Sequence, residues 1–270
     1  MKNKILIFST YISIIIFITA CQEDKINESG TITTQDYLFA EHLFNDIGRI
    51  VEDAFISNGE NKSCPGYTLM NLDTSNIDTI ILDFGDGYPD DCLSYGKERR
   101  GKIIITYTGK YRDSLSIIQT TFDHYYVNNN WIQGERVLTN NGRNQIGNII
   151  FSIEIIGASI TGNGTINWEA NMTQELISGS GTIDPIDDKY MISGNASGSS
   201  SNGEDFSVTI TEDIYADMSC AFINSCILTS GSAELTPEGY TTRYISYGDS
   251  ICDCNFWINL NDEDHFIVIN

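Results

Sequence analysis

Basic side chains, histidine and proline are scarce in this sequence of 270 residues. Its 15 Lys and Arg are outnumbered by 37 Asp and Glu, and the formal charge of −22 excludes simple nucleic-acid binding because a polyanion is repelled. Only three histidines are present, each isolated in the sequence, so a Ser-His-Asp type of catalytic site has little support. The hydrophobic content of 41% is near the globular norm and excludes a disordered chain.

A long apolar run is also missing. The uncharged segment from Ile5 to Ala20 has sixteen residues, which is short for a spanning helix, and it follows two lysines in the order typical of a secretory signal. It ends in Ile18-Thr19-Ala20-Cys21, which resembles the lipobox of bacterial lipoproteins, where cleavage precedes a lipidated cysteine. We therefore predict a signal peptide over residues 1–20 and lipidation of Cys21; the alternative is an anchor helix that stays in the membrane.

The residues after Cys21, up to position 32, lack a packing pattern and are predicted to form a flexible tether. Glu23 and Asp24 look like the signal with which Bacteroidota export lipoproteins to the cell exterior; an ordinary charged linker is the alternative. We therefore predict an outer-membrane protein that faces the cell exterior and is held in the lipid by the acylated Cys21. Several acyl chains bury enough methylene groups for a stable anchor.

The seven cysteines leave an even set of six once Cys21 is set apart, and six cysteines in an exported protein can pair fully. Cys64 and Cys92 are the first predicted pair. The other four form two close groups, Cys220 with Cys226 and Cys252 with Cys254. If the two segments run antiparallel, Cys226–Cys252 and Cys220–Cys254 would be neighbouring disulfides. A four-cysteine zinc site is the rival interpretation, which the Cys-x-Cys spacing and an oxidising compartment disfavour.

Residues 33–57 carry the one clear helical pattern. Apolar residues recur there three and four positions apart and predict a single stripe that packs on the rest of the body. They are Tyr37, Ala40, Phe44, Ile47, Val51 and Phe55. Thr33 with Asp36 resembles a capping box at the start of the helix. His42 falls on the opposite face and is predicted to be a solvated surface residue.

Beyond Cys64 the apolar period changes to two, and successive strands are predicted with tight turns such as Asn141-Gly142 between them. No later segment is a helix long enough for a crossover, so neighbouring strands must pair antiparallel. The Gly- and Ser-rich segment from Ile177 to Asp205 is where we predict the weakest or most extensively looped part of the sheet. The predicted fold is all-β with one N-terminal helix, a single domain over residues 33–270 whose long antiparallel meander forms a strongly curved sheet or an open barrel.

Several short motifs are spread over most of the predicted mature chain. They are Asp83-Phe84-Gly85, Arg100-Gly101-Lys102-Ile103, Tyr107-Thr108-Gly109, Asn140-Asn141-Gly142, Tyr247-Gly248-Asp249 and Cys252-Asp253. With these motifs the sequence resembles a family of outer-membrane or surface lipoproteins that is widespread in Bacteroidota. The family has no established biochemical activity and supplies no catalytic residues. The resemblance implies a lipoprotein and a pairing of Cys226 with Cys252.

No motif of a serine hydrolase, a zinc protease or a P-loop enzyme is present. Asp83, Asp86, Asp90 and Asp91 lie within nine residues and are candidate ligands of Ca²⁺, a cation that prefers oxygen ligands. Asp and Gly are also ordinary turn residues, which is the simpler interpretation of this loop. A carboxylate pair for glycoside hydrolysis is another candidate, but nothing singles out one pair among 37 acidic residues. No other cofactor is predicted.

Aromatic side chains crowd adjacent predicted strands. Tyr107, Tyr125, Tyr126 and Trp131 are candidates for a binding face, although cross-strand aromatic packing is the simpler interpretation. Tyr125 and Tyr126 must point to opposite faces of their strand, so one of the two faces would be core. Separately, Asp113-Ser114-Leu115 resembles the acceptor for O-glycosylation in exported Bacteroidota proteins and makes Ser114 a candidate modification site.

Together these features predict a surface-exposed outer-membrane lipoprotein that acts as a non-enzymatic binding or envelope-structural module. The alternatives are a glycan-directed hydrolase that uses a carboxylate pair and a Ca²⁺-dependent adhesin. The predicted partners are the outer-membrane lipid and a polysaccharide or protein ligand, and not a nucleic acid. The sequence leaves the oligomeric state open.

Overall fold

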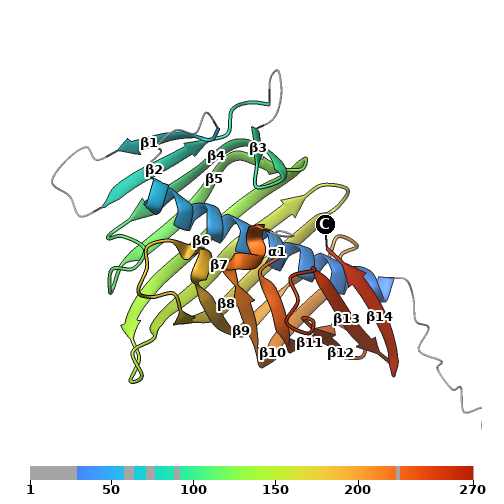
Figure 1. Cartoon of the computed structure of the whole chain (residues 1–270). Coiled ribbons are helices and arrows are strands. Elements are labelled where there is room, and N and C mark those ends of the chain that lie inside the picture. Colours follow the sequence, from blue (N-terminus) through green and yellow to red (C-terminus); the bar gives the residue numbers. More distant parts are fainter. Residues whose placement is uncertain (1–28, 58–63, 71–76, 88–91, 223–225, 270) are drawn as a thin grey trace, which may run out of the picture.

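The computed structural model describes residues 29–57, 64–70, 77–87, 92–222 and 226–269, and it consists of one 14-stranded sheet and one long helix, α1 (Ser29–Ser57) (Figure 1). The strands are β1 (Gly66–Met70), β2 (Asp78–Asp83), β3 (Cys92–Ser94), β4 (Lys97–Tyr107), β5 (Ile117–Val127), β6 (Asn130–Arg143), β7 (Ile149–Thr161), β8 (Thr165–Ser178), β9 (Lys189–Ser199), β10 (Asp205–Asp217), β11 (Leu228–Pro237), β12 (Arg243–Ser246), β13 (Asn255–Leu260) and β14 (Glu263–Val268). Two short 3-10 helices, η1 (Pro185–Asp187) and η2 (Met218–Phe222), complete the fold.

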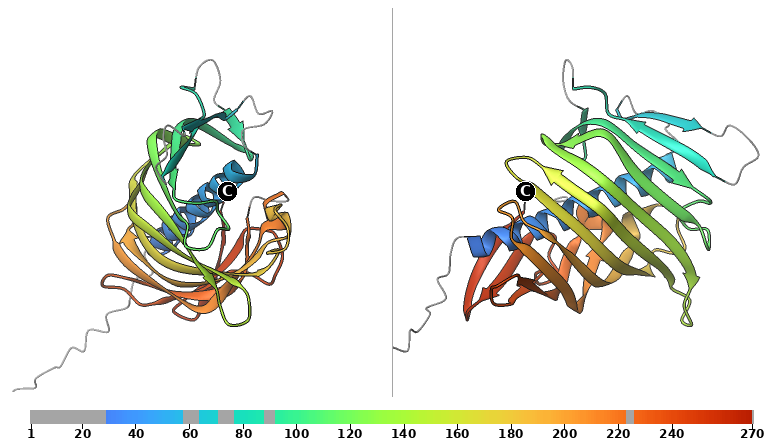
Figure 2. Two further views of the ribbon diagram at one scale, coloured as in Figure 1. Left: turned by 90° about the vertical axis from the view of Figure 1, so that its left-hand side faces the viewer. Right: turned by 180° about the vertical axis from the view of Figure 1, so that it is seen from behind.

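The sheet is an antiparallel meander in which each strand pairs with its neighbours in the chain, except that β3 pairs only with β4 and lies off the main path. The path begins at β1 and ends at β14, and these two strands do not pair with each other, so the sheet stays open. It curls into a trough, and α1 lies inside the trough (Figure 2). The prediction of an all-β meander with one N-terminal helix and a strongly curved sheet is confirmed.

The curl is helped by irregular positions at which one strand holds an extra residue. Between Arg100 and Lys102 the register of β4 against β5 shifts, and Gly101 adopts a φ of +83° there. A side chain at this position would place its Cβ 1.9 Å from the carbonyl oxygen of His124, so glycine is required. Such bulges bend a strand and increase its twist.

Helix α1 buries the predicted apolar stripe against the concave face of the sheet. The Phe44 ring lies 5.2 Å from the Trp168 ring of β8, and the Tyr37 ring lies 6.1 Å from the Phe206 ring of β10, measured between centroids. The helix begins at Ser29, inside the predicted tether, and therefore earlier than the predicted start at residue 33. No helix among the described residues is both long enough and apolar enough to cross a membrane.

The predicted capping box at the start of the helix is wrong, because Thr33 and Asp36 lie within α1 and bind the β9–β10 turn instead. The Thr33 hydroxyl donates to the Glu204 carboxylate at 2.5 Å, and the Ser201 N–H donates to Asp36 at 2.7 Å. These contacts fasten the first turns of the helix to the sheet.

The second face of α1 is buried as well, which corrects the prediction that His42 is a surface residue. His42 is only 8% exposed. Two segments lie at the mouth of the trough beside the helix (Figure 1). One is residues 179–188, which include η1, and the other is η2. We call these two segments the cover. The two segments of the cover are joined by a hydrogen bond from the Met218 N–H to the Asp188 carbonyl at 3.0 Å.

Three disulfides are present among the six cysteines predicted to pair. Cys64–Cys92 is confirmed. The other two are Cys220–Cys252 and Cys226–Cys254, so the predicted pairing of Cys226 with Cys252 is wrong. The earlier cysteine of one segment pairs with the earlier cysteine of the other, which differs from the connectivity predicted for antiparallel segments. Because all four sulfurs are oxidised, they do not form the rival zinc site.

The Gly- and Ser-rich segment is also more regular than predicted. Its strand β9 pairs over most of its length with β8 on one side and β10 on the other. Its longer connection is residues 179–188, which form part of the cover, and residues 200–204 form the tight turn between β9 and β10.

Candidate functional site

Charged side chains on one side of α1 are the most unusual feature of the interior, because such groups are rarely buried without partners. Glu41, Asp46, Arg49 and Glu52 are all buried inside the trough. Their spacing of three to five residues brings them to one side of the helix. Each of them meets partners that are distant in the sequence.

Glu41 is held by two tyrosine hydroxyls. Tyr37 of the same helix donates to one carboxylate oxygen at 2.9 Å, and Tyr247 donates to the other at 2.8 Å. Burial raises the pKa of Glu41 to about 7, although both hydroxyls act in the opposite direction. Tyr247 lies just beyond β12, so this cluster ties the helix to the C-terminal part of the sheet.

Asp46 forms the centre of a fully buried ion-pair cluster. Its two oxygens accept hydrogen bonds from Arg49 at 2.7 Å and from Arg99 of β4 at 2.6 Å. Arg99 also donates to the Tyr125 hydroxyl at 2.8 Å and to the Ser94 carbonyl at 3.2 Å. Burial by itself would raise the pKa of Asp46, but the two guanidinium groups outweigh it and hold that pKa below its ordinary value.

His42 completes this cluster as a neutral ring. Its Nε2 lies 3.2 Å from the Lys97 ammonium group, which can only donate, and its Nδ1 lies 3.7 Å from the Cys226 sulfur. Burial, followed by the charge of Lys97, lowers the pKa of His42 to about 4. The ring is therefore a hydrogen-bonding bridge between β4 and a disulfide.

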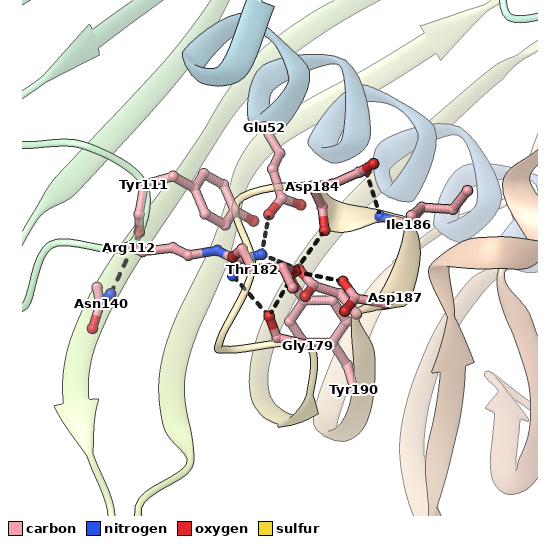
Figure 3. A network of polar contacts seen from close by, with 11 residues as sticks. Glu52, Tyr111, Arg112, Asn140, Gly179, Thr182, Asp184, Ile186, Asp187 and Tyr190 are labelled. Atoms are coloured by element: carbon pink, nitrogen blue, oxygen red, sulfur yellow. Dashed lines mark hydrogen bonds and ion pairs between the residues drawn. The ribbon is translucent and has the colours of Figure 1, made fainter.

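Arg112 contacts both the cover and the helix, as Figure 3 shows. Its guanidinium donates to the carbonyls of Gly179 at 3.1 Å and Thr182 at 2.5 Å, and to the Asp188 carboxylate at 2.5 Å. The same nitrogen that binds Asp188 lies 3.9 Å from a Glu52 oxygen. One side chain from the β4–β5 connection thus joins α1 to the cover.

Glu52 and Asp188 are a buried carboxylate pair on either side of this arginine. Burial, followed by the charge of Asp188, raises the pKa of Glu52 to about 8. Burial also raises the pKa of Asp188 to about 6, against the effect of Arg112. At neutral pH the pair therefore carries one proton on Glu52, and Asp188 is the ionised partner of Arg112.

The space beside Glu52 is small. A hollow lined by Glu52, Arg136, Tyr111 and Tyr190, among others, has a volume of about 20 Å³, which accommodates a water molecule. Among the described residues, one Glu52 oxygen and Nη1 of Arg136 have no hydrogen-bond partner, and both side chains line this hollow. The carboxylate pair can hold and exchange a proton, but the space is too small for a sugar.

The outer face of the sheet, opposite α1, offers more room. A shallow groove of about 510 Å³ crosses β7 to β10 over Gly157 and Gly198. Its exposed lining consists of hydroxyl, amide and carboxylate groups, among them Asn167, Glu169 and Ser197. The Asn167 amide donates to the Ser199 hydroxyl at 2.8 Å, so part of this polar lining is fixed in place. These are groups that can form hydrogen bonds with a ligand that is rich in hydroxyls.

The four aromatic residues predicted to form a binding face are divided between the two faces of the sheet. Tyr125 is buried in the interior beside Arg99, and Tyr107 packs on Phe55 of α1, with ring centroids 4.9 Å apart. Tyr126 and Trp131 lie on the outer face and stack on each other at 6.3 Å. Tyr126 and Trp131 are direct cross-strand partners. Their stacking is therefore the cross-strand aromatic packing that was the simpler interpretation of these residues. The expectation that Tyr125 and Tyr126 point to opposite faces is confirmed.

The candidate calcium ligands are only partly described. Asp83 accepts a hydrogen bond from the Gly85 N–H at 2.9 Å and pairs with Lys102 at 3.2 Å, as expected of a turn residue. Asp86 is described, while Asp90 and Asp91 lie outside the described residues. Within the described part of the chain, no three His, Cys, Asp or Glu side chains gather as they would around a metal ion.

Two predicted modification sites remain predictions. Cys21, with the signal peptide and most of the predicted tether, lies outside the described residues. Ser114 is exposed in the connection between β4 and β5, where it is accessible to a modifying enzyme.

Sequence reasoning missed the buried charges along α1 and the partners that hold them. The only signal was the presence of Glu41, Asp46, Arg49 and Glu52 at helical spacing, which is equally typical of a solvated helix face. Comparisons with protein-family models, with curated proteins and with solved structures found no match.

Proposed function

We propose that this protein is a lipid-anchored outer-membrane protein that faces the cell exterior and acts as a non-enzymatic binding module. The observation that carries the proposal is the contrast between the two faces of the sheet. The inner hollow of about 20 Å³ has room for water, whereas the outer groove of about 510 Å³ has the volume of a ligand site.

The chemistry of the outer face supports a neutral, hydroxyl-rich ligand. Glu169 and Asp205 border the groove, and no basic side chain is among the described residues that line it. An anionic ligand would meet repulsion over most of this surface. Amides and hydroxyls remain as the groups that recognise a ligand.

The hydrolase alternative finds less support. Glu52 and Asp188 are a carboxylate pair with separated pKa values, as glycoside hydrolysis requires, but Asp188 belongs to the cover itself and both side chains are buried. A glycosidic bond would have to reach a hollow that fits one water molecule. We therefore expect binding without turnover.

The location is tested by protease shaving of intact native cells, with a periplasmic protein as control and mass spectrometry of the released peptides. We expect peptides from the described body to be released while the control protein stays intact. A Cys21→Ser variant should instead be lost from the outer-membrane fraction, because its anchor is missing. Full protection of the body in intact cells, combined with cleavage after lysis, would contradict exposure on the cell surface.

A further inference from the structure

The outer face of the last three strands carries an exposed aromatic patch. Tyr244 of β12 is 56% exposed, Trp257 of β13 48% and Phe266 of β14 49%. Trp257 and Phe266 are direct cross-strand partners with ring centroids 5.0 Å apart. Tyr244 lies diagonally to Trp257, because Trp257 pairs with Ser246, two residues further along β12. We call Tyr244, Trp257 and Phe266 the aromatic platform.

Polar side chains alternate with these rings on the same face. Asn259 is the cross-strand partner of Tyr244 on one side and of Asp264 on the other. The Asn259 amide donates to the Asp264 carboxylate at 2.7 Å, which fixes both groups beside the rings. Rings next to fixed amide and carboxylate groups provide apolar contact area and hydrogen bonds side by side.

The platform is connected to the groove by one continuous row of outward-facing residues. The row runs across successive strands through Asn171, Asn195, Thr209, Glu234, Tyr244, Asn259 and Asp264, each the register partner of the next. Ser197 of the groove is the next outward-facing residue after Asn195 on β9. A ligand long enough to follow the row would contact both the groove and the platform.

The charges on this face indicate which kind of ligand fits. Glu234 and Asp264 border the platform, and the whole chain carries −22, so an anionic polymer and a second copy of this chain would both be repelled. A neutral polysaccharide has no charge to be repelled. Its sugar rings present apolar C–H faces that stack on aromatic rings, and its hydroxyls match the amides and carboxylates.

We propose that the aromatic platform is a binding site for a neutral polysaccharide, with Trp257 as its central stacking residue. The inference rests on the proposed function as a surface binding module and names its ligand class. Tyr244 and Phe266 extend the apolar contact to either side of Trp257. Asn259 and Asp264 bind hydroxyl groups of the sugar that lies between the rings.

The test is affinity electrophoresis of the full mature protein in native gels that contain dextran, xylan or soluble starch, with alginate as the anionic comparison. We expect retardation in at least one neutral gel and none in alginate. Trp257→Ala should weaken that retardation at least tenfold, and Trp257→Phe should recover part of it. Trp131→Ala is the matched control, because Trp131 also lies on the outer face but is stacked on Tyr126, and it should leave the retardation unchanged.

The outcomes separate this inference from the proposed function. If Trp257→Ala binds like the wild type while Asn167→Ala in the groove does not, the platform is not the site but the binding module stands. If the wild type is retarded in none of the neutral gels, the polysaccharide proposal is wrong, and protease shaving still decides separately on surface exposure. If sedimentation shows a dimer that Trp257→Ala dissociates, the platform is an interface between two copies and the proposal is overturned.

Discussion

At the scale of single residues, Asp46 shows how a charge can be kept inside this protein. It receives one hydrogen bond from each of two arginines, and Arg99 also donates to Tyr125 and Ser94. Nearly every member of the cluster is buried, so the loss of one partner leaves the others without compensation. The cluster contributes a unique position of α1 against β4 rather than a large net stability.

Replacing Asp46 by Asn should therefore be strongly destabilising. The change removes the negative charge between Arg49 and Arg99, and breaking such a buried pair costs about 3–5 kcal/mol. Asp83→Asn is the matched control, because Asp83 and Lys102 are roughly half exposed and such a pair contributes about 1 kcal/mol or less. Urea unfolding of both variants measures the difference, and equal losses would contradict the role assigned to Asp46.

At the scale of structural elements, the cover explains why a helix with two dissimilar faces is buried on both. The apolar stripe of α1 packs on the sheet. The polar side of α1 is covered by Arg112, Asp188 and η2. Arg49 reaches the Ala221 carbonyl of η2 at 3.4 Å. The disulfides Cys220–Cys252 and Cys226–Cys254 then fasten the segment that contains η2 to the β12–β13 connection.

The connectivity of these disulfides can be checked directly. Digestion of the non-reduced protein with an Asp-specific protease separates Cys252 from Cys254 by cleaving before Asp253, and chymotrypsin separates Cys220 from Cys226 after Phe222. Mass spectrometry should find Cys220 linked to Cys252 and Cys226 linked to Cys254. Peptides that link Cys226 to Cys252 would contradict this connectivity.

At the scale of the whole molecule, the buried carboxyl groups make stability depend on pH. Glu41 and Glu52 have folded pKa values of about 7 and about 8, above the ordinary value of 4.5. The folded state thus keeps protons that the unfolded chain releases, and this contribution to stability is lost as the pH rises. His42, with a pKa lowered from 6.5 to about 4, acts in the opposite direction, but only below about pH 6.5.

Between pH 6.5 and pH 8 the two glutamates are therefore expected to dominate, and the free energy of unfolding should fall by about 2 kcal/mol. Unfolding in urea across this pH range measures the fall. Glu52→Gln keeps the shape of the protonated side chain beside Arg112, Asp188 and Arg136, and it should flatten most of the slope. A wild type whose stability is constant from pH 6.5 to pH 8 would contradict the raised pKa values.

How much of this could be predicted from the sequence depended on the distance over which each signal acts. The alternation of apolar and polar residues is local, and Asn- and Gly-containing turns fix short connections, so the antiparallel meander and the helical stripe were predictable. Cys64–Cys92 followed from counting, because one early pair remained once the other cysteines were grouped. The burial of His42 was not predictable, because its contact partners Lys97 and Cys226 lie 55 and 184 positions later in the chain.

The sequence by itself determined which segments are strands, that they pair in chain order and that one helix packs on them. Only the tertiary structure decided which atoms of distant strands meet. It placed Tyr107 and Tyr125 on the inner face of the sheet and Tyr126 and Trp131 on the outer face. It determined the disulfide partners of Cys226 and Cys220. It also brought Tyr244, Trp257 and Phe266 together on one outer face. The physical reason is that periodicity fixes the side of a strand on which a residue lies. Curvature, bulges such as that at Gly101, and register fix which other residues it faces.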